Sequence, residues 1–205
     1  MSLGLAPFPT GLSLPEGLLL GLRMAYSKPR RYYHNFSHVL EVLGHYRLVD
    51  SHVGWQHPKE VYCAALYHDA IYAYGAKDNE KQSAELARNE LARWLPHGGL
   101  NLDTVARLIV LTASHGTLKR SQVSAEERLF LDCDMAIMAS EWPRFQRYEE
   151  DIQKEYTQIY SLELFRQGRR VFLENLRKKE RIFLSDFFHE RLDSLARRNL
   201  NKALD

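Results

Sequence analysis

The chain has 205 residues, of which 45% are hydrophobic and 26% are charged, and its 28 Lys and Arg nearly balance its 26 Asp and Glu. This composition is typical of a folded domain with a substantial core, and it excludes collagen-like, low-complexity and intrinsically disordered chains. The formal net charge of +2 argues against nucleic acid as the main ligand, because neutralising phosphates takes a large excess of Lys and Arg.

Apolar residues recur at helical spacing in almost every segment after Arg30, and no alternating strand of useful length appears. The sequence therefore predicts an all-α fold. No repeat or long linker marks a second domain, so we expect one domain over residues 1–205, with a core over about 30–140 and a helical C-terminal part over about 141–205. The expected helices lie near 15–26, 35–50, 58–73, 78–95, 102–114, 124–139, 142–159, 161–180 and 186–201.

The two cysteines, Cys63 and Cys133, lie in apolar helical segments, and two thiols are too few for a disulfide framework. We interpret them as reduced core residues of a cytoplasmic protein. The Leu-rich stretch from Gly11 to Tyr26 is interrupted by Pro15 and charged residues, so we expect neither a signal peptide nor a membrane span there.

Histidines and carboxylates occupy helix faces that should be apolar. In the expected helix 58–73, His68 continues the apolar stripe and Asp69 is its neighbour. His38 shares a helix face with His34, one turn earlier. Two further inward-facing groups are His115, at the end of the expected helix 102–114, and Asp134, in the expected helix 124–139.

Burying several such polar groups is costly unless something satisfies them together, and a divalent metal ion does so. Mn, Mg, Fe, Zn, Ni and Co ions all bind imidazole or carboxylate ligands, and the sequence predicts a divalent ion without specifying which of them. A single core histidine is more often only hydrogen-bonded, so the prediction depends on the whole set. The predicted ligands are His38, His68, Asp69 and Asp134.

Several segments resemble the HD-domain metal-dependent phosphohydrolase superfamily, and most closely a group of bacterial proteins described as predicted HD phosphohydrolases. The resemblance is carried by YHNFSH at 33–38, LYHDA at 66–70, DNEKQSA at 78–84 and DCDM at 132–135. It implies an HD-domain-like helical bundle with additional C-terminal helices, and it extends from about residue 30 to the C-terminus.

The same resemblance implies roles for individual residues. His38, His68, Asp69 and Asp134 match the metal ligands of the family, and Asp69 is the one able to bridge to a second ion. His34 matches a histidine that protonates a leaving oxygen in similar enzymes. His115 is similar to an extra histidine that binds a second metal or the phosphate.

Hydrolysis of a phosphate ester also needs cations beside the phosphoryl oxygens and a correctly oriented water molecule. Arg30, Arg31 and Arg169 are candidates for the first task, although surface arginines are usually only solvated. Asn79 and Glu80 are candidates for contacting the substrate or orienting the water, although helix capping alone would also favour polar residues there.

The sequence thus predicts a metal-dependent phosphohydrolase acting on a small phosphorylated molecule, for which a nucleotide is allowed because several tyrosines lie near the motifs. One alternative is a phosphodiesterase or nuclease acting on cyclic dinucleotides or RNA, which would use the 11 Lys and Arg against 7 Asp and Glu of residues 161–205. Another is a non-catalytic regulatory module that contains the metal. No membrane partner is expected, and a homo-oligomer is compatible with the sequence.

Overall fold

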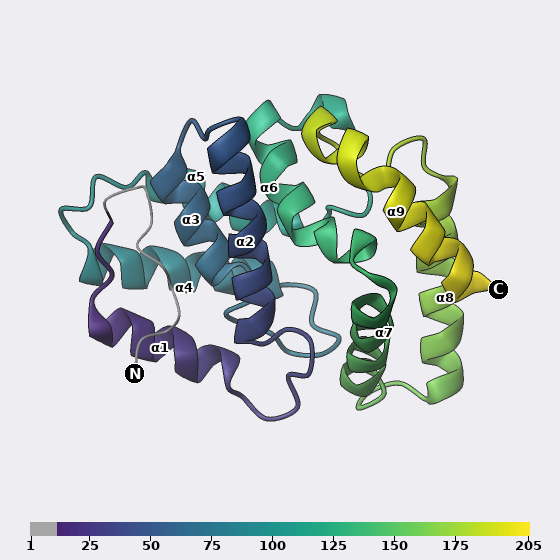
Figure 1. Ribbon diagram of the computed structural model, residues 1–205. Coiled ribbons are helices and arrows are strands. Elements are labelled where there is room, and N and C mark those ends of the chain that lie inside the picture. The colour runs from purple at the N-terminus through teal and green to yellow at the C-terminus, as the bar shows by residue number, and fades with distance from the viewer. Residues whose placement is uncertain (1–11) are drawn as a thin grey trace. The chain divides into compact units, whose positions relative to one another are not determined.

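A computed structural model describes residues 12–205, and this part of the chain contains helices and no strands (Figure 1). The prediction of an all-α fold is therefore confirmed. The chain divides into two compact units, one formed by residues up to 29 together with 34–113, and the other by residues 30–33 together with 114–205. The division near residue 114 comes earlier than the boundary expected near 140.

The first unit is organised around one short, almost completely buried helix. This helix, α3 (Pro58–Tyr67), starts with a proline in its first turn and is buried at every position from Glu60 onward. It contacts three of the other helices of the unit, α2, α4 and α5. The remaining helices are α1 (Glu16–Tyr26), α2 (Phe36–His52), α4 (Asn79–Trp94) and α5 (Leu102–Thr112), as Figure 1 shows.

Helix α3 ends at Tyr67, so the helix expected over 58–73 is too long by about six residues. Side chains from α4 explain the early end. The Ser83 hydroxyl accepts the N–H of Ile71 and donates to its carbonyl, while the Asn79 amide makes the same two kinds of bond with Ala73. Because these backbone groups are satisfied from α4, residues 71–73 need no helical hydrogen bonds.

The second unit contains the remaining helices and shows why the boundary falls near residue 114. Helix α9 contacts α6 and η2 as well as α8, so the segment expected as the helix 124–139 belongs with the C-terminal helices. That segment changes from α-helix to 3-10 geometry at Ala136. The elements are η1 (Arg120–Gln122), α6 (Ala125–Met135), η2 (Ala136–Ala139), α7 (Trp142–Tyr156), α8 (Leu162–Lys178) and α9 (Asp186–Leu204).

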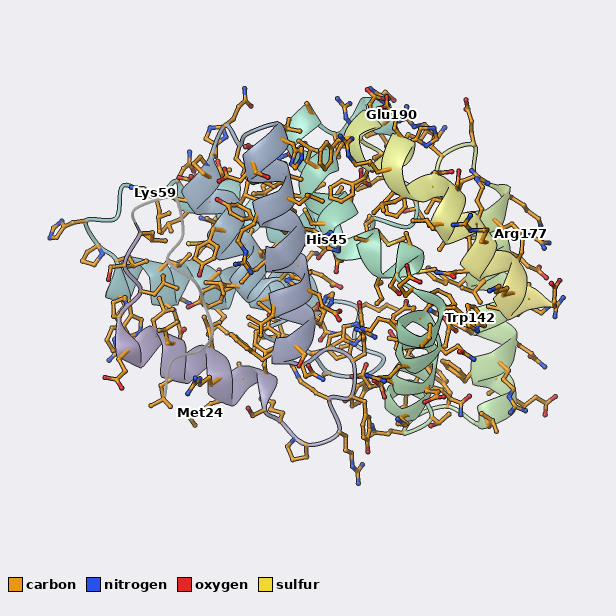
Figure 2. All side chains as sticks on the ribbon, viewed as in Figure 1. Met24, His45, Lys59, Trp142, Arg177 and Glu190 are labelled. Carbon is orange, nitrogen blue, oxygen red and sulfur yellow. The ribbon has the colours of Figure 1, made fainter. Side chains whose placement is uncertain are left out.

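Aromatic packing joins α7 to the end of α9. The Trp142 ring, at the start of α7, stacks on Phe145 with ring centroids 5.6 Å apart. The Lys202 ammonium group lies 5.1 Å from the centroid of the same Trp142 ring, which is labelled in Figure 2. The apolar body and cation–π attraction of Trp142 therefore connect the two helices.

Two carboxylates hold the loop that leads into α9. Asp193 Oδ1 accepts the N–H groups of Ile182 and Phe183. Asp132, on α6, accepts the N–H groups of Leu184 and Ser185 and also the Ser185 hydroxyl. Burial raises the pKa of Asp132 to about 6, against the lowering effect of these hydrogen bonds.

None of the helices formed by residues 12–205 combines the length and apolar character needed to cross a membrane. The Leu-rich stretch from Gly11 to Tyr26 was expected not to span a membrane. The structure describes this stretch from Leu12 on, and Gly11 lies outside the described residues. In the described part, α1 buries Leu18, Leu22 and Tyr26 along one face, whereas Leu20 is exposed.

We expect Asp132→Ala to lower the free energy of unfolding by about 2–4 kcal/mol, because it leaves two buried N–H groups and a buried hydroxyl without their acceptor. Urea denaturation followed by circular dichroism measures this loss. The control is Asp103→Ala, which removes only a surface ion pair with Arg88 and should cost less than about 1 kcal/mol. Equal losses in the two variants would contradict the role given to Asp132.

Candidate metal centre

Three potential ligand atoms converge in the first unit. His38 Nε2 and His68 Nε2 lie 3.0 Å apart, and Asp69 Oδ2 lies 3.5 Å from the first and 3.2 Å from the second. A point just outside the plane of these atoms lies about 2 Å from all three, which matches typical metal–nitrogen and metal–oxygen bonds of ~2.0–2.2 Å. Among the described residues, this set has the spacing needed to hold a metal ion.

The local structure explains how these three side chains meet. His38 lies in the first turn of α2, whose N-cap Asn35 accepts the Ser37 N–H with its side chain. His68 is the C-cap residue of α3, and Asp69 follows it directly. The side chains of His38 and His68 are only 3% and 1% exposed, whereas that of Asp69 is 13% exposed. Both histidines are therefore buried, and Asp69 is the most exposed of the three side chains.

A hydrogen bond fixes the protonation state that His68 needs as a ligand. Its Nδ1 lies 2.9 Å from the carbonyl oxygen of Ala65, which can only accept, so Nδ1 carries the proton. In the neutral ring, Nε2 then has a free lone pair that points toward His38 and Asp69. This carbonyl contact is the usual way in which proteins orient a metal-binding histidine.

Tyr26 orients the Asp69 backbone. The fully buried Tyr26 hydroxyl accepts the Asp69 N–H at 3.3 Å and donates to the Leu66 carbonyl at 3.0 Å. No sequence pattern identifies this tyrosine, because it lies 43 residues before Asp69 and has the spacing of an ordinary core residue of α1.

The three imidazoles beside Asp69 keep its carboxylate ionised. Burial raises the pKa of Asp69, but when the neighbouring imidazoles carry protons, the charge and hydrogen bond of His68, together with the charges of His34 and His38, hold it well below its usual range. An ionised carboxylate is the form that binds a divalent cation.

His34, the predicted proton donor, lies at the same site. Its ring stacks on Tyr72, with centroids 4.0 Å apart and planes 19° apart, and its centroid is 6.1 Å from that of His38. The structure thus brings His34, His38, His68 and Asp69 together in the first unit. Stacking on Tyr72 fixes the orientation of the His34 ring, which is only half-buried.

The other two predicted metal or phosphate residues belong to the second unit. Asp134 Oδ2 lies 3.0 Å from His115 Nδ1, and the two side chains are 11% and 29% exposed. The sequence predicted inward-facing polar groups at both positions, and the structure places the two half-buried groups beside each other. The roles of Asp134 as a fourth ligand and of His115 as a second-metal or phosphate ligand stay predictions.

The residues predicted to contact the substrate have structural partners. Arg30 donates to Gln158 at 3.3 Å, and Arg31 is buried. Asn79 is also buried, and both ends of its amide bind the backbone of Ala73. Glu80 lies in the first turn of α4. Their roles at a phosphate group stay predictions.

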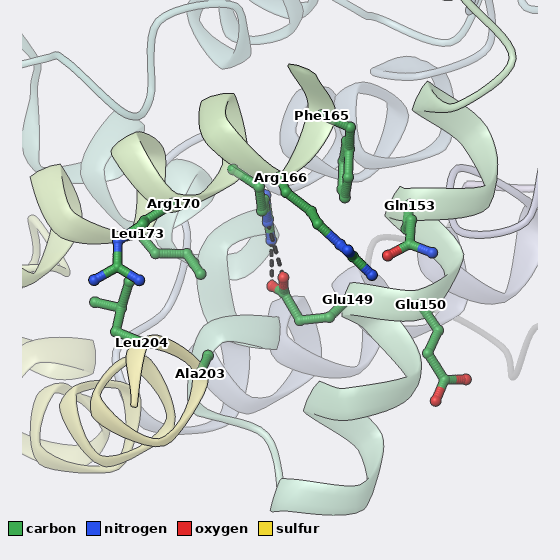
Figure 3. Close-up of a pocket in the computed structure, with 10 residues that line it drawn as sticks. Glu149, Glu150, Gln153, Phe165, Arg166, Arg170, Leu173, Ala203 and Leu204 are labelled. Carbon is green, nitrogen blue, oxygen red and sulfur yellow. Dashed lines mark hydrogen bonds and ion pairs between the residues drawn. The ribbon is translucent and has the colours of Figure 1, made fainter. Parts of the chain in front are cut away.

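Arg169 borders a pocket of about 350 Å³ between α7, α8 and the end of α9 in the second unit (Figure 3). Its guanidinium group makes a two-point ion pair with Glu149, marked by dashed lines in Figure 3, at 3.0 and 2.5 Å. It also lies over the rings of Tyr148 and Phe172. Glu149 therefore neutralises the positive charge of Arg169, which the sequence predicted to contact a phosphate group.

In comparisons with known proteins, no family model matches the chain, and no curated protein or solved structure matches it either. Membership of the HD-domain superfamily therefore stays a prediction from the four motifs.

We expect divalent metal ions to raise the thermal unfolding temperature. A ligand that binds only the folded state stabilises it by about 2.7 kcal/mol at a hundredfold excess over Kd. Differential scanning fluorimetry with Mn²⁺, Co²⁺, Ni²⁺ or Zn²⁺ measures the shift, which His68→Gln should abolish. The control is His97→Gln, an exposed histidine outside the centre, which should keep the full shift. An equal shift in wild type and His68→Gln would place the metal elsewhere.

Proposed function

We propose that the protein is a metal-dependent phosphohydrolase that acts on a small phosphorylated molecule. The observation that carries the proposal is the convergence of His38 Nε2, His68 Nε2 and Asp69 Oδ2 at 3.0–3.5 Å from one another, with Asp69 the most exposed of the three side chains. Two imidazoles and one carboxylate fit borderline divalent ions and leave coordination positions for water and substrate.

A divalent ion held by these side chains would polarise a phosphoryl oxygen and activate a water molecule as the nucleophile. The protein contributes the orientation of the ligands. The Ala65 carbonyl fixes the ring of His68, and the Tyr26 hydroxyl fixes the backbone at Asp69. Preorganised groups of this kind need no rearrangement during the reaction.

His34 is the group best placed to protonate the leaving oxygen. It is half-buried beside Asp69, and stacking on Tyr72 holds its ring. Imidazole is the side chain that most often acts as a general acid in enzymes. The half-buried Tyr72 and Tyr74 rings lie edge to face with each other, and Tyr72 is the ring on which His34 stacks. We propose that the two tyrosines form the wall for an aromatic part of the substrate, such as a nucleobase.

We also propose a cytoplasmic location. Cys63 and Cys133 are free and buried, as is typical of proteins in a reducing compartment.

We expect His68→Gln and Asp69→Asn to lower kcat/KM for phosphate esters more than about 100-fold. The loss should exceed the roughly 10- to 100-fold effect of removing a group that only supports a metal ligand, because these residues are themselves the proposed ligands. A screen of nucleotides, phosphomonoesters and cyclic dinucleotides against several divalent ions finds the substrate. Elemental analysis of the same samples should show that both variants lose the ion. Full activity in metal-depleted variants would overturn the mechanism, and a bound ion without activity on any phosphate ester would favour a non-catalytic module.

The role of His34 predicts a dependence on the leaving group. His34→Gln should slow hydrolysis of an alkyl phosphate by about 10²–10⁴-fold, because the departing alkoxide needs a proton. It should slow hydrolysis of p-nitrophenyl phosphate far less, since nitrophenolate departs without one. Steady-state kinetics on the two substrates give the comparison. Equal losses on both would show that His34 binds substrate or metal and does not act as the acid.

A further inference from the structure

Two side chains of α4 hold the short segment that follows His68 and Asp69. The Ser83 hydroxyl accepts the Ile71 N–H at 3.0 Å and donates to the Ile71 carbonyl at 3.2 Å. The Asn79 amide makes the same two kinds of bond with Ala73, at 2.9 and 3.0 Å. Both side chains are buried, and Ser83 is completely so. The backbone is thus attached to α4 at residue 71 and again at residue 73.

Tyr72 is the residue between these two attachments. Its ring stacks on His34, the proposed proton donor, with centroids 4.0 Å apart and planes 19° apart. The Tyr74 ring packs against it edge to face, with centroids 5.6 Å apart. A residue has only two soft backbone dihedrals, and here both of its neighbours are fixed. The Tyr72 ring therefore has a defined position beside the imidazole.

The segment needs this support because no helix orders it. Helix α3 ends at Tyr67 and α4 begins at Asn79. Ile71 and Tyr72 are only half-buried, and Ala73 is exposed. Segments with few buried contacts and accessible backbone hydrogen bonds are the ones that open most easily in a folded protein. Bonds from buried side chains of α4 oppose such opening.

His34 depends on side-chain contacts more than the proposed metal ligands do. Helix α2 begins at Phe36 with Asn35 as its N-cap, so His34 precedes the helix. His38, in contrast, lies in the first turn of α2, and His68 is the C-cap residue of α3. Because helical hydrogen bonds do not fix the backbone at His34, contacts of its ring must fix the imidazole. The stacking on Tyr72 is one of these contacts.

From these contacts we infer that Ser83 is a positioning residue for His34. It acts through the backbone of Ile71 on Tyr72, and the stacked ring of Tyr72 then sets the orientation of the imidazole. Asn79 supports the same segment from the other side. All of these residues belong to the first unit. The inference rests on the proposed function for its effect on catalysis, whereas its effect on the orientation of the imidazole does not depend on catalysis.

The structural test compares wild type with Ser83→Ala, which removes both bonds to Ile71. The variant should speed hydrogen exchange of the Ile71 amide about tenfold, the effect expected from losing one hydrogen bond. NMR of the His34 ring protons detects the stacking, because the face of an aromatic ring shifts nearby protons upfield. Tyr72→Leu gives the His34 shift without that ring, and Ser83→Ala should move the shift most of the way to this value. Comparison at the high-pH plateau of a titration removes the effect of imidazole protonation.

The kinetic test uses the leaving group. Ser83→Ala should lower kcat for an alkyl phosphate by about 10- to 100-fold, because a misplacement of about 1 Å can cost about 10²-fold. It should lower kcat for p-nitrophenyl phosphate far less, since nitrophenolate departs without a proton from His34. A purely structural role of Ser83 would reduce the amount of folded enzyme and so lower both rates equally.

The matched control is Thr112→Val in the same unit. Thr112 is also a buried residue, and its hydroxyl donates to the Ile109 carbonyl at 2.7 Å within α5. Its loss should lower thermal stability without changing amide exchange, the imidazole shift or the ratio of the two rates. If Ser83→Ala does not fold, Asn79→Leu takes its place. That variant releases the other attachment, so the amide measured is then that of Ala73.

An unchanged His34 shift in Ser83→Ala would overturn the inference, as would an equal change in Thr112→Val. An equal loss of kcat on both substrates, or no loss, would also overturn it. Failure of the proposed function gives a different result. A wild-type protein that hydrolyses no phosphate ester would overturn the enzyme, and the exchange and shift measurements would still decide whether Ser83 positions the imidazole.

Discussion

The close approach of two imidazole nitrogens and one carboxylate oxygen is the constraint on which the rest of the first unit depends. His38 Nε2, His68 Nε2 and Asp69 Oδ2 lie within 3.5 Å of one another, and both histidines are almost completely buried. Such an arrangement costs free energy unless a cation compensates it. Its neighbours are arranged to hold it: Ala65 and Tyr26 fix His68 and Asp69, while Ser83 and Asn79 secure the loop that follows.

Buried carboxylates have a different task in the second unit. There they hold the backbone of loops, and not a metal ion. Asp132 and Asp193 together accept four consecutive N–H groups before α9, and Glu155 accepts that of Tyr33. Each of these carboxylates replaces water that the buried N–H groups have lost. The loops that they hold are irregular but have fixed positions, which a catalytic or binding site needs.

Much of this organisation was predictable from the sequence, because helical periodicity indicates which residues of a helix face the core. It gave the positions of most helices and the burial of His38 and His68. The shared helix face of His34 and His38 was wrong, because α2 begins at Phe36 and His34 precedes its N-cap, although the two rings lie 6.1 Å apart. The end of α3 was not predictable, since it depends on side chains of α4 that bond to a backbone 6–12 residues away. Glu155 left a signal: it continues the buried stripe of Phe145, Tyr148 and Ile152 at helical spacing, where a carboxylate is out of place. Its partner, 122 residues distant, left none.

The central claim is that His38, His68 and Asp69 bind one divalent ion. The most direct measurement is anomalous X-ray diffraction, at the absorption edge of the metal, from crystals of the wild-type protein grown with Mn²⁺ or Zn²⁺. We expect one anomalous peak about 2 Å from His38 Nε2, His68 Nε2 and an Asp69 carboxylate oxygen. A crystal with full metal occupancy elsewhere and no peak between these three side chains would contradict it.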